Sequence, residues 1–255
     1  MFADERQQLI ADLARRDGRV VVTALAVELD VAPETVRRDL DALATQGLVR
    51  RVHGGAVPTD ETSGHEAPVA QRALEHSDAK LRIARAALDL LPTGRSSIIL
   101  DAGTTTAQLA ELLPARPELL VVTNSVPIAA RLGSTHAGEV HLLGGRVRGV
   151  TQATVGETGV RQLERLRTDV AFLGSDGVAI GHGLSTPDQS EASVKRAMRR
   201  GARSVVALVD ASKMGRELLH SFARLEDVDV LVTDASIDAR AIAAIEQAGV
   251  TVVTA

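Results

Sequence analysis

The sequence predicts an α/β protein in which a small α+β winged helix-turn-helix domain precedes a larger domain with a mostly parallel sheet. Two observations support this prediction. From residue 78 onward, short apolar runs alternate with helical segments of about ten residues, which is typical of a parallel sheet covered by helices. Before that point, three short amphipathic stretches and a basic turn lie within residues 1–57. We therefore expect domains at 1–57 and 77–255, joined by a linker at 58–76.

The composition excludes several classes of protein. Aromatic residues make up 1% of the chain, so it has no platform on which single-stranded bases would stack. It has no cysteine, which excludes disulfides, thiolate catalysis and cysteine-ligated metals. The amino terminus is unlike a signal peptide, and no apolar run is long enough to span a membrane. We therefore expect a cytoplasmic protein without a membrane partner.

The first 30 residues predict two helices, at 5–16 and 22–29, that pack through aliphatic side chains. Thr23 is a candidate N-cap for the second helix. The side chains expected to face inward are Leu9, Ile10 and Leu13 in the first helix and Leu25, Ala26 and Leu29 in the second.

Residues 33–45 predict a short helix with one buried face. Its apolar residues recur at i, i+4 and i+7, which places them on one stripe. Pro33 suits the first turn, where a missing N–H costs nothing, and Gly47 follows as a stop signal. The inward stripe is Val36, Leu40 and Leu43, and the outward residues and their flanks are Glu34, Thr35, Arg37, Arg38 and Asp41.

A basic turn follows this helix. Arg50, Arg51 and His53 precede Gly54-Gly55, a pair that allows a sharp reversal of the backbone. With the preceding helix, this pattern predicts a winged helix-turn-helix for duplex DNA, in which the start of the recognition helix meets base edges. The expected DNA-contacting residues are Thr23, Pro33, Glu34, Thr35, Arg37, Arg38, Arg50, Arg51 and His53.

The charge of the chain sets a condition on this prediction. The whole chain carries a formal charge of −4, and residues 1–57 contain eight arginines against nine acidic residues. No overall positive field therefore steers the protein to DNA, and binding must depend on where individual arginines lie. The alternative interpretation is a helical hairpin with a solvated, charged face.

The segment at 58–76 is polar and lacks sustained periodicity, with a short helical turn expected at 69–74. Its two histidines, His65 and His76, show no metal-ligand spacing, so we expect no metal site. The α/β pattern then begins. Strands are expected at 97–100, 119–122, 140–143, 170–173, 205–209, 228–232 and 250–253, and helices at 78–91, up to about 113, up to 132, at 190–200 and at 239–248.

Five of these strands end in small polar residues, in the loops after residues 100, 122, 143, 173 and 209. Ligands of open α/β sheets bind beyond the carboxyl ends of the strands, so we expect these loops to converge on one pocket. The Gly103–Thr106 loop places hydroxyl and N–H groups at the start of a helix, which suits phosphate. Asp101 would repel phosphate, so we place it on a ligand hydroxyl or as an orienting acceptor. An ordinary strand–turn–helix cap is the alternative for this loop.

Lysine is scarce in this chain. Only Lys80, Lys195 and Lys213 are lysines among 29 basic residues. Lys195 and Lys213 lie in or beside the predicted pocket, which indicates that a compact ammonium group is useful there. We expect Lys80 to be structural. The alternative for Lys195 is an i, i+4 pair with Glu191.

Two sets of motifs in this chain occur together in one known family. In the first half they are Thr35-Val36-Arg37-Arg38-Asp39-Leu40, Leu43, Gly47, Leu48, Arg51 and His53-Gly54-Gly55-Ala56. In the second half they are Asp101–Thr106, Thr123-Asn124, Gly144-Gly145, Gly156-Glu157, Gly174–Gly177, Thr186 to Glu191, Lys195 and Asp210 to Lys213. With these motifs, both halves of the chain resemble the DeoR family of transcriptional regulators. Two positions depart from the family pattern: Ala32 stands where the family usually has a capping serine, and Met214 where it more often has an aromatic or another bulky apolar residue.

The resemblance implies a sensor domain similar in fold to ribose-5-phosphate isomerase and a phosphorylated sugar as effector. It implies that the Gly103–Thr106 loop holds the phosphate with Lys213 nearby, and that Asp101, Asp176, Glu191 and Lys195 face the sugar. We expect no catalytic residue, cofactor or metal. The predicted effector-binding residues are Asp101, Gly103, Thr104, Thr105, Thr106, Thr123, Asn124, Gly144, Gly145, Asp176, Glu191, Lys195, Asp210 and Lys213.

We therefore expect a transcriptional regulator that represses a sugar-metabolism operon and whose DNA affinity changes when a phosphorylated sugar binds. Its partners would be double-stranded operator DNA, the effector and further copies of the chain, as a dimer or tetramer, because a palindromic site needs a two-fold partner. One alternative is a sugar-phosphate isomerase in which Asp176, Glu157 and Lys195 supply a general base and an electrophile. Another is a regulator whose sensor has lost its ligand and serves only in assembly.

Overall fold

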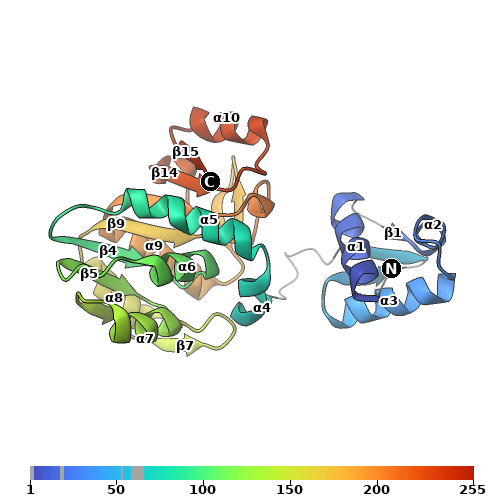
Figure 1. Cartoon of the computed structure of the whole chain (residues 1–255), viewed down its shortest axis with the longest axis horizontal. Helices are drawn as coiled ribbons and strands as arrows, with labels where there is room; N and C mark the ends of the chain where they lie inside the picture. Colours follow the sequence, from blue (N-terminus) through green and yellow to red (C-terminus); the bar gives the residue numbers. More distant parts are fainter. Residues whose placement is uncertain (1–2, 18–19, 53, 59–65) are drawn as a thin grey trace. The chain divides into compact units, whose positions relative to one another are not determined.

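The chain divides into two compact units, residues 1–65 and 66–255 (Figure 1). The computed structural model describes residues 3–17, 20–52, 54–58 and 66–255; His53 and His65 lie outside this part. The second unit begins at Glu66, inside the segment that we expected to be a linker. Within that segment, helix α4 (Val69–Leu74) forms where the sequence predicted a short helical turn.

The first unit consists of three helices and a small antiparallel sheet whose strand order is β1-β3-β2. The helix–helix–helix–hairpin order is that of a winged helix-turn-helix, as predicted. Its elements are α1 (Ala3–Asp17), β1 (Val20–Val21), α2 (Val22–Glu28), α3 (Pro33–Thr45), β2 (Val49–Val52) and β3 (Gly55–Pro58).

The core of the first unit follows the predicted stripe of α3. Val36, Leu40 and Leu43 are at most 1% exposed, which confirms that prediction. Ile10 of α1 is also fully buried, but the prediction for Leu9 was wrong because that side chain is 41% exposed. Two alanines one turn apart, Ala11 and Ala14, face the core instead and let the helices approach closely.

Helix α2 begins directly after a strand rather than at a side-chain cap. Val21 holds the N-cap position without a side-chain hydrogen bond, so the prediction of a Thr23 cap was wrong. The N–H of Val22 instead donates to the Gly54 carbonyl at 2.9 Å. The hairpin that pairs with β1 therefore supplies an acceptor for one of the backbone N–H groups at the start of α2, a role that a side-chain cap would otherwise have.

Gly55 is required where the hairpin crosses β1. A Cβ atom at this position would lie 1.9 Å from the Val20 carbonyl oxygen, a contact that only glycine avoids. Gly54 beside it has a φ of +77°, in the left-handed region. The sequence predicted a sharp turn at this pair. The structure shows a second reason for glycine here, which is the close approach of β1.

The motif also contains a buried ion pair that the sequence did not reveal. Asp39 of α3 is 4% exposed, and its Oδ2 accepts a hydrogen bond of 2.6 Å from Arg6 Nε on α1. Gln7 donates to the other carboxylate oxygen at 3.1 Å. Asp39 therefore fixes α3 against α1, while the neighbouring Arg37 and Arg38 remain exposed.

The second unit is built on a seven-stranded, fully parallel sheet with the order β15-β14-β12-β9-β4-β5-β6. All seven strands match runs that the sequence predicted. Their bounds are β4 (Ser96–Leu100), β5 (Leu119–Thr123), β6 (Val140–Leu142), β9 (Thr168–Gly174), β12 (Ala202–Leu208), β14 (Val230–Thr233) and β15 (Thr251–Thr254). The helices are α5 (Ser77–Ala87), α6 (Thr104–Leu112), α7 (Val126–Thr135), α8 (Glu157–Glu164), α9 (Gln189–Gly201) and α10 (Ala239–Gln247).

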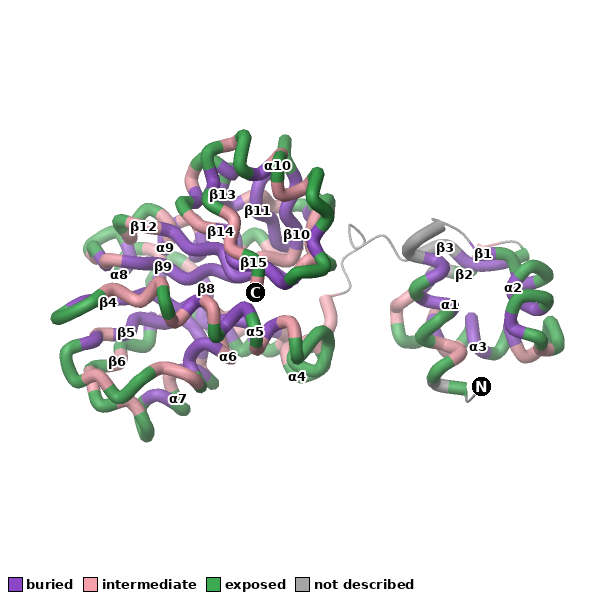
Figure 2. Tube along the Cα trace, turned by 45° about the horizontal axis from the view of Figure 1, so that its top comes forward, coloured by how far each residue is buried: buried purple, intermediate pink, exposed green. Residues whose placement is uncertain are grey.

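Helices cover both faces of this sheet. Side chains alternate along each strand: on β4, Ile98 and Leu100 pack against α5, α6 and α7, whereas Ile99 packs against the side of α8, α9 and α10. Phe172 and Ala171 of β9 divide in the same way. The central strands are accordingly buried along most of their length (Figure 2).

Several short elements of the second unit were not predicted. They form two small antiparallel sheets beside the main one. Strands of three or four residues contain too few positions to show a period, so the sequence alone did not reveal them. The strands are the hairpin β7 (Arg146–Arg148) and β8 (Ala153–Val155), and the group β10 (Gly177–Ala179), β11 (Gly183–Thr186) and β13 (His220–Ala223). Helix α8 and the short 3-10 turns at Ala211–Lys213 and Leu225–Asp227 were also not predicted, whereas the 3-10 turn at Leu88–Leu90 forms the end of the helix predicted at 78–91.

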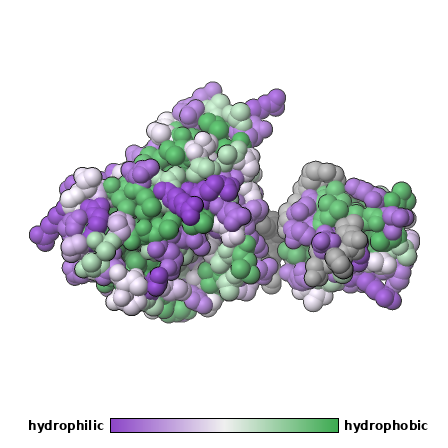
Figure 3. Space-filling model, viewed as in Figure 1, coloured by the Kyte–Doolittle hydropathy of each residue, from purple (hydrophilic) through white to green (hydrophobic). Residues whose placement is uncertain are grey.

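The surface of the second unit is mixed in character. On the face seen in Figure 3, hydrophilic side chains follow α5, where Asp78, Arg82 and Arg85 are exposed. In the part of the chain that the structure describes, no helix combines the length and the apolar character needed to cross a membrane.

Candidate functional site

In the first unit, the start of α3 presents its polar side chains to solvent. Glu34, Arg37 and Arg38 are exposed and Thr35 is half-buried. Arg37 is held by Glu34, with 3.0 Å between Nη1 and Oε2, whereas Arg38 makes no ion pair among the described residues. The N-cap residue Ala32 makes no side-chain hydrogen bond, as its identity predicted.

The wing adds one described arginine to this surface. Arg51 of β2 is exposed, and its Nε lies 3.2 Å from Oδ1 of Asp41 on the outward side of α3. The side chain of Arg50 and the whole of His53 lie outside the described residues. The arrangement of α3 and the β2–β3 hairpin is that of a helix and wing that dock on duplex DNA.

In the second unit, three strand ends meet around one cavity. The loops after β4, β9 and β12 line it. These strands are neighbours in the sheet, and the chain leaves β4 towards one face and β9 towards the other. Such a switch in direction opens a crevice at the carboxyl ends of the strands, which explains why the cavity lies here.

The other two loops that we expected at this cavity do not line it. Asn124, after β5, donates from Nδ2 to the Thr154 carbonyl at 3.1 Å and thereby holds β8, while the Thr123 hydroxyl accepts from the Ser125 N–H. After β6, the Gly144 N–H donates to Gln162 at 2.8 Å. Gly145 has a φ of +141° and packs against β8. Convergence of all five loops was therefore wrong, because β5 and β6 lie at one edge of the sheet.

The Gly103–Thr106 loop fits both interpretations of its sequence, the anion site and the helix cap. Gly103, Thr104 and Thr105 line the cavity, and the N–H groups in the first turn of α6 have no partner within the helix, so this end suits an anion. Thr106 is fully buried instead, where its Oγ1 accepts from the Gly103 N–H and lies 2.9 Å from Asp101 Oδ1. Thr106 thus shapes the loop from within.

Asp101 and Lys195 form a buried ion pair at the base of the cavity. Asp101 is 0% exposed and Lys195 8%, and the ammonium group contacts Asp101 Oδ2 and, at 3.0 Å, the Gly174 carbonyl. The same carboxylate accepts from the Gly174 N–H at 2.9 Å. The alternative of a Lys195–Glu191 pair was therefore wrong, and Asp101 acts as an orienting acceptor.

The protonation of Lys195 follows from these contacts. Burial alone would lower the pKa of the ammonium group, but the Asp101 carboxylate, with Asp176 and Glu191 nearby, raises the pKa above its ordinary value. The ring of Phe222 adds a cation–π contact, with its centroid 5.3 Å from Nζ. Lys195 is therefore a fixed positive charge beside the cavity.

All three lysines of the chain line this cavity. The expectation that Lys80 is only structural was incomplete. Lys80 is 5% exposed and donates to the Arg72 carbonyl, and burial lowers its pKa, although nearby Asp210 opposes that shift. Lys213 makes no ion pair among the described residues. It lines the cavity together with Asp210, whose carboxylate accepts a hydrogen bond from the Ser212 N–H.

The remaining predicted carboxylates of the cavity are held by arginines and hydroxyls. Asp176 Oδ1 lies 2.9 Å from Arg72 Nη1, and its Oδ2 accepts from Thr186 at 3.1 Å. Glu191 accepts from Thr151 and lies 3.3 Å from Arg148 Nη1. Asp176 and Glu191 both line the cavity, as does Asp210.

One wall of the cavity comes from a segment that the sequence did not single out. Arg72, Glu75, His76 and Lys80 line the cavity from α4, α5 and the corner between them, where His76 has a φ of +51°. Lysine scarcity was the one signal that could have identified Lys80. Met214, which departs from the family pattern, packs against the core, and its backbone forms a β-bridge with Val178.

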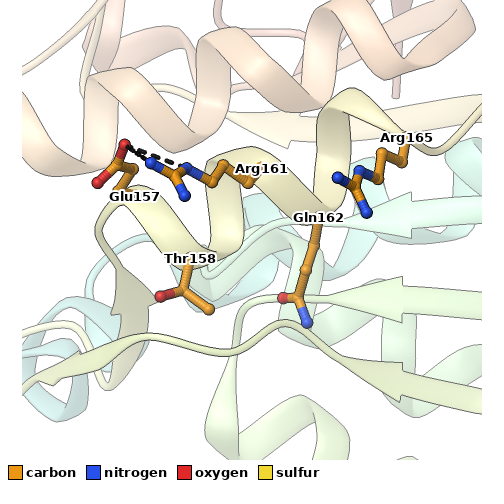
Figure 4. Close-up of a pocket in the computed structure, with 5 residues that line it drawn as sticks. All are labelled: Glu157, Thr158, Arg161, Gln162 and Arg165. Atoms are coloured by element: carbon orange, nitrogen blue, oxygen red, sulfur yellow. Dashed lines mark hydrogen bonds and ion pairs between the residues drawn. The ribbon is translucent and has the colours of Figure 1, made fainter.

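The residues required for the isomerase alternative do not come together. Asp176 and Lys195 line the cavity, but Glu157 lies at a second, shallow hollow on α8, lined by Glu157, Thr158, Arg161, Gln162 and Arg165 (Figure 4). Glu157 is paired there with Arg161 at 2.5 Å. Four of the side chains come from α8 and the fifth, Arg165, from its C-cap, so this hollow lacks convergent groups from other elements.

Comparison with known proteins covers both units. Residues 6–62 match the family model of the DeoR-like helix-turn-helix domain, and residues 75–235 match that of the DeoR C-terminal sensor domain. Among solved structures, ribose 5-phosphate isomerase A from Methanocaldococcus jannaschii is 21% identical, with a TM-score of 0.41 over 56% of this chain and 57% of that chain.

Curated relatives match over nearly the whole length. The HTH-type transcriptional regulator GlpR of Haloferax volcanii is 39% identical over 99% of this chain and 98% of its own. The glycerol-3-phosphate regulon repressor of Escherichia coli strain K12 is 32% identical over 92% of each chain. This chain therefore belongs to the DeoR family and is a DNA-binding transcriptional regulator rather than an enzyme.

Proposed function

We propose that this regulator represses an operon of carbohydrate metabolism and that a phosphorylated sugar in the cavity of the second unit controls its affinity for the operator. The observation that carries the proposal is the joint presence of Lys213, Thr104 and Thr105 around one cavity whose base holds the Asp101–Lys195 pair. A relative of similar length is a glycerol-3-phosphate regulon repressor, which supports a phosphate ester as the class of ligand.

The cavity offers separate groups for the two ends of such a ligand. The phosphate would bind the N–H groups at the start of α6 together with the Lys213 ammonium group. The sugar hydroxyls would then meet acceptors on Asp176, Asp210 and Glu191, and the buried Asp101 would keep Lys195 oriented. In this arrangement the negative phosphate meets a positive group, and the carboxylates accept hydrogen bonds from neutral hydroxyls.

On DNA, residues 1–57 supply the contacts. The start of α3 would place Thr35, Arg37 and Arg38 at base edges in the major groove, with Pro33 and Glu34 beside them. Thr23 on α2 and the wing residues Arg50, Arg51 and His53 would contact the backbone or the adjacent groove. Because the net charge is −4, these local arginines would provide most of the attraction.

The test is a fluorescence anisotropy titration of the DNA upstream of the protein's own gene, at fixed salt because phosphate contacts make affinity steeply salt-dependent. The probes are glycerol-3-phosphate, ribose-5-phosphate, glucose-6-phosphate and fructose-1-phosphate, with inorganic phosphate as a control. We expect one sugar phosphate to change operator affinity by fivefold or more, a typical size for coupling between sites. In Lys213→Met, we expect that shift to require about tenfold more ligand while operator affinity without ligand stays unchanged.

Two outcomes would contradict the proposal. Binding to the upstream DNA no tighter than to unrelated DNA would remove the regulator's target. Flat thermal shifts with every sugar phosphate would favour a sensor that has lost its ligand and serves only in assembly.

We also infer that the protein acts as a dimer or tetramer, because a helix-turn-helix that reads a palindrome needs a two-fold partner. Light scattering coupled to gel filtration should show at least twice the mass of 26.8 kDa. A single species at the monomer mass, with and without operator DNA, would contradict this inference.

A further inference from the structure

A single stretch of chain connects the two units, and the second unit begins at Glu66. Glu66 is therefore the first described residue through which the cavity can influence the attachment of the DNA-binding unit. Its side chain is 7% exposed, and both carboxylate oxygens are buried. A buried carboxylate is costly unless it is paired, so its partners are informative.

Two arginines hold Glu66 in place. Its Oε2 lies 2.5 Å from Arg148 Nη1 on β7, and its Oε1 lies 3.6 Å from Arg72 Nη2 on α4. The backbone adds a further tie beside them, because the Val69 N–H donates to the Val150 carbonyl at 2.8 Å. The start of the second unit is thus fixed to the β7–β8 hairpin.

The same two arginines hold three further carboxylates, and two of them, Asp176 and Glu191, line the cavity. Arg72 pairs with Asp176 at 2.9 Å, and Arg148 lies 3.3 Å from both Asp188 and Glu191. Four carboxylates therefore share two guanidinium groups. Burial and the nearby Glu191 raise the pKa of the Glu66 carboxyl, although both arginines oppose that shift. Glu66 thus responds to charges that border the cavity.

The ligand would act on one end of this network only. Asp176, Glu191 and Arg72 line the cavity, whereas Glu66 and Arg148 do not. Arg72 reaches both sides of the network, because its Nη1 holds Asp176 and its Nη2 faces Glu66. A ligand that bonds Arg72 or Asp176 changes how strongly Arg72 is held, and weakly screened buried charges pass that change on to Glu66.

We propose that Glu66, Arg72, Arg148 and Asp176 form a linker clasp that transmits occupancy of the cavity to the segment leading into the DNA-binding unit. This inference rests on the proposed function, since it names the route by which the same site regulates DNA binding. Glu66 and Arg148 are positioning residues in this route, because they contact the ligand-facing groups and not the ligand.

The test is the variant Glu66→Gln, which removes the charge and keeps the size of the side chain. We measure operator affinity with and without the sugar phosphate that gives the largest shift in the wild-type protein, and ligand affinity without DNA. The wild-type protein should show a change in operator affinity of fivefold or more, and Glu66→Gln a change below about twofold. Ligand affinity without DNA should remain within about twofold in the variant. The matched control Glu111→Gln breaks an exposed pair with Arg131 and should keep the full response.

A second measurement uses the wild-type protein and does not depend on a variant that folds. Hydrogen exchange of residues 66–76 should slow by fivefold or more when the same sugar phosphate is added. Unchanged exchange in this segment, or a full response of operator affinity in Glu66→Gln, overturns the clasp and leaves the proposed function intact. A wild-type protein whose operator affinity no sugar phosphate changes overturns both.

Discussion

Replacing Asp101 with alanine should lower the free energy of unfolding of the second unit by about 3–5 kcal/mol, the cost of leaving one partner of a buried ion pair uncompensated. Asp101 is 0% exposed, and the Lys195 side chain is 11% exposed, so water cannot replace the carboxylate. Without Asp101, burial lowers the pKa of Lys195 with less opposition. Urea unfolding followed by circular dichroism measures the loss, since the chain has no tryptophan or tyrosine.

The double variant Asp101→Ala/Lys195→Met is the control for this prediction. It removes both charges, and a buried pair replaced by apolar groups is often neutral in stability. We therefore expect it to recover most of the stability that the single variant loses, without restoring ligand binding. A single variant as stable as the wild-type protein would show that Lys195 does not depend on Asp101.

Replacing Arg38 with alanine should weaken operator binding by about 1–3 kcal/mol, the usual cost of losing an arginine at a base edge. Arg38 is exposed and makes no ion pair among the described residues, whereas Arg37 is held by Glu34. We therefore expect Arg38→Ala to cost more than Arg37→Ala, and the double variant to bind operator DNA no better than unrelated DNA. Anisotropy titrations on operator and scrambled duplexes measure both quantities.

The salt dependence of the same titrations separates two roles for Arg38. A base contact relaxes sequence preference and leaves the salt slope nearly unchanged, whereas a phosphate contact weakens all duplexes alike and reduces the slope by about 1. The control is Arg161→Ala, an exposed arginine on α8 in the second unit, which should leave binding unchanged. Loss of binding in that control would place DNA contacts outside the first unit.

Features that depend on neighbours in the chain could be predicted. Val36, Leu40 and Leu43 form the buried stripe that their spacing indicated, because helical periodicity is a local property. The seven strands and the helices between them, apart from α8, followed from the same kind of pattern. Leu9 was misplaced because the edge of a helical stripe depends on what packs against it.

The site could be predicted only in part. Gly103 and Thr104 were predicted because strands of a parallel sheet end at one edge, and Lys195 and Lys213 because lysine is scarce in the chain; all four line the cavity. The loops after β5 and β6 were indistinguishable from them in sequence. Strand order decides between them, and that order results from long-range packing.

The sequence by itself determined the family, the three-helix motif with its wing, and the alternating strands of the larger domain. The tertiary structure alone decided which charges meet. Asp101 and Lys195 are 94 residues apart in the chain, and Arg72 and Asp176 are 104 apart. Such pairs carry no periodic signal, because their energy depends on the burial and proximity that arise once β9 lies between β4 and β12.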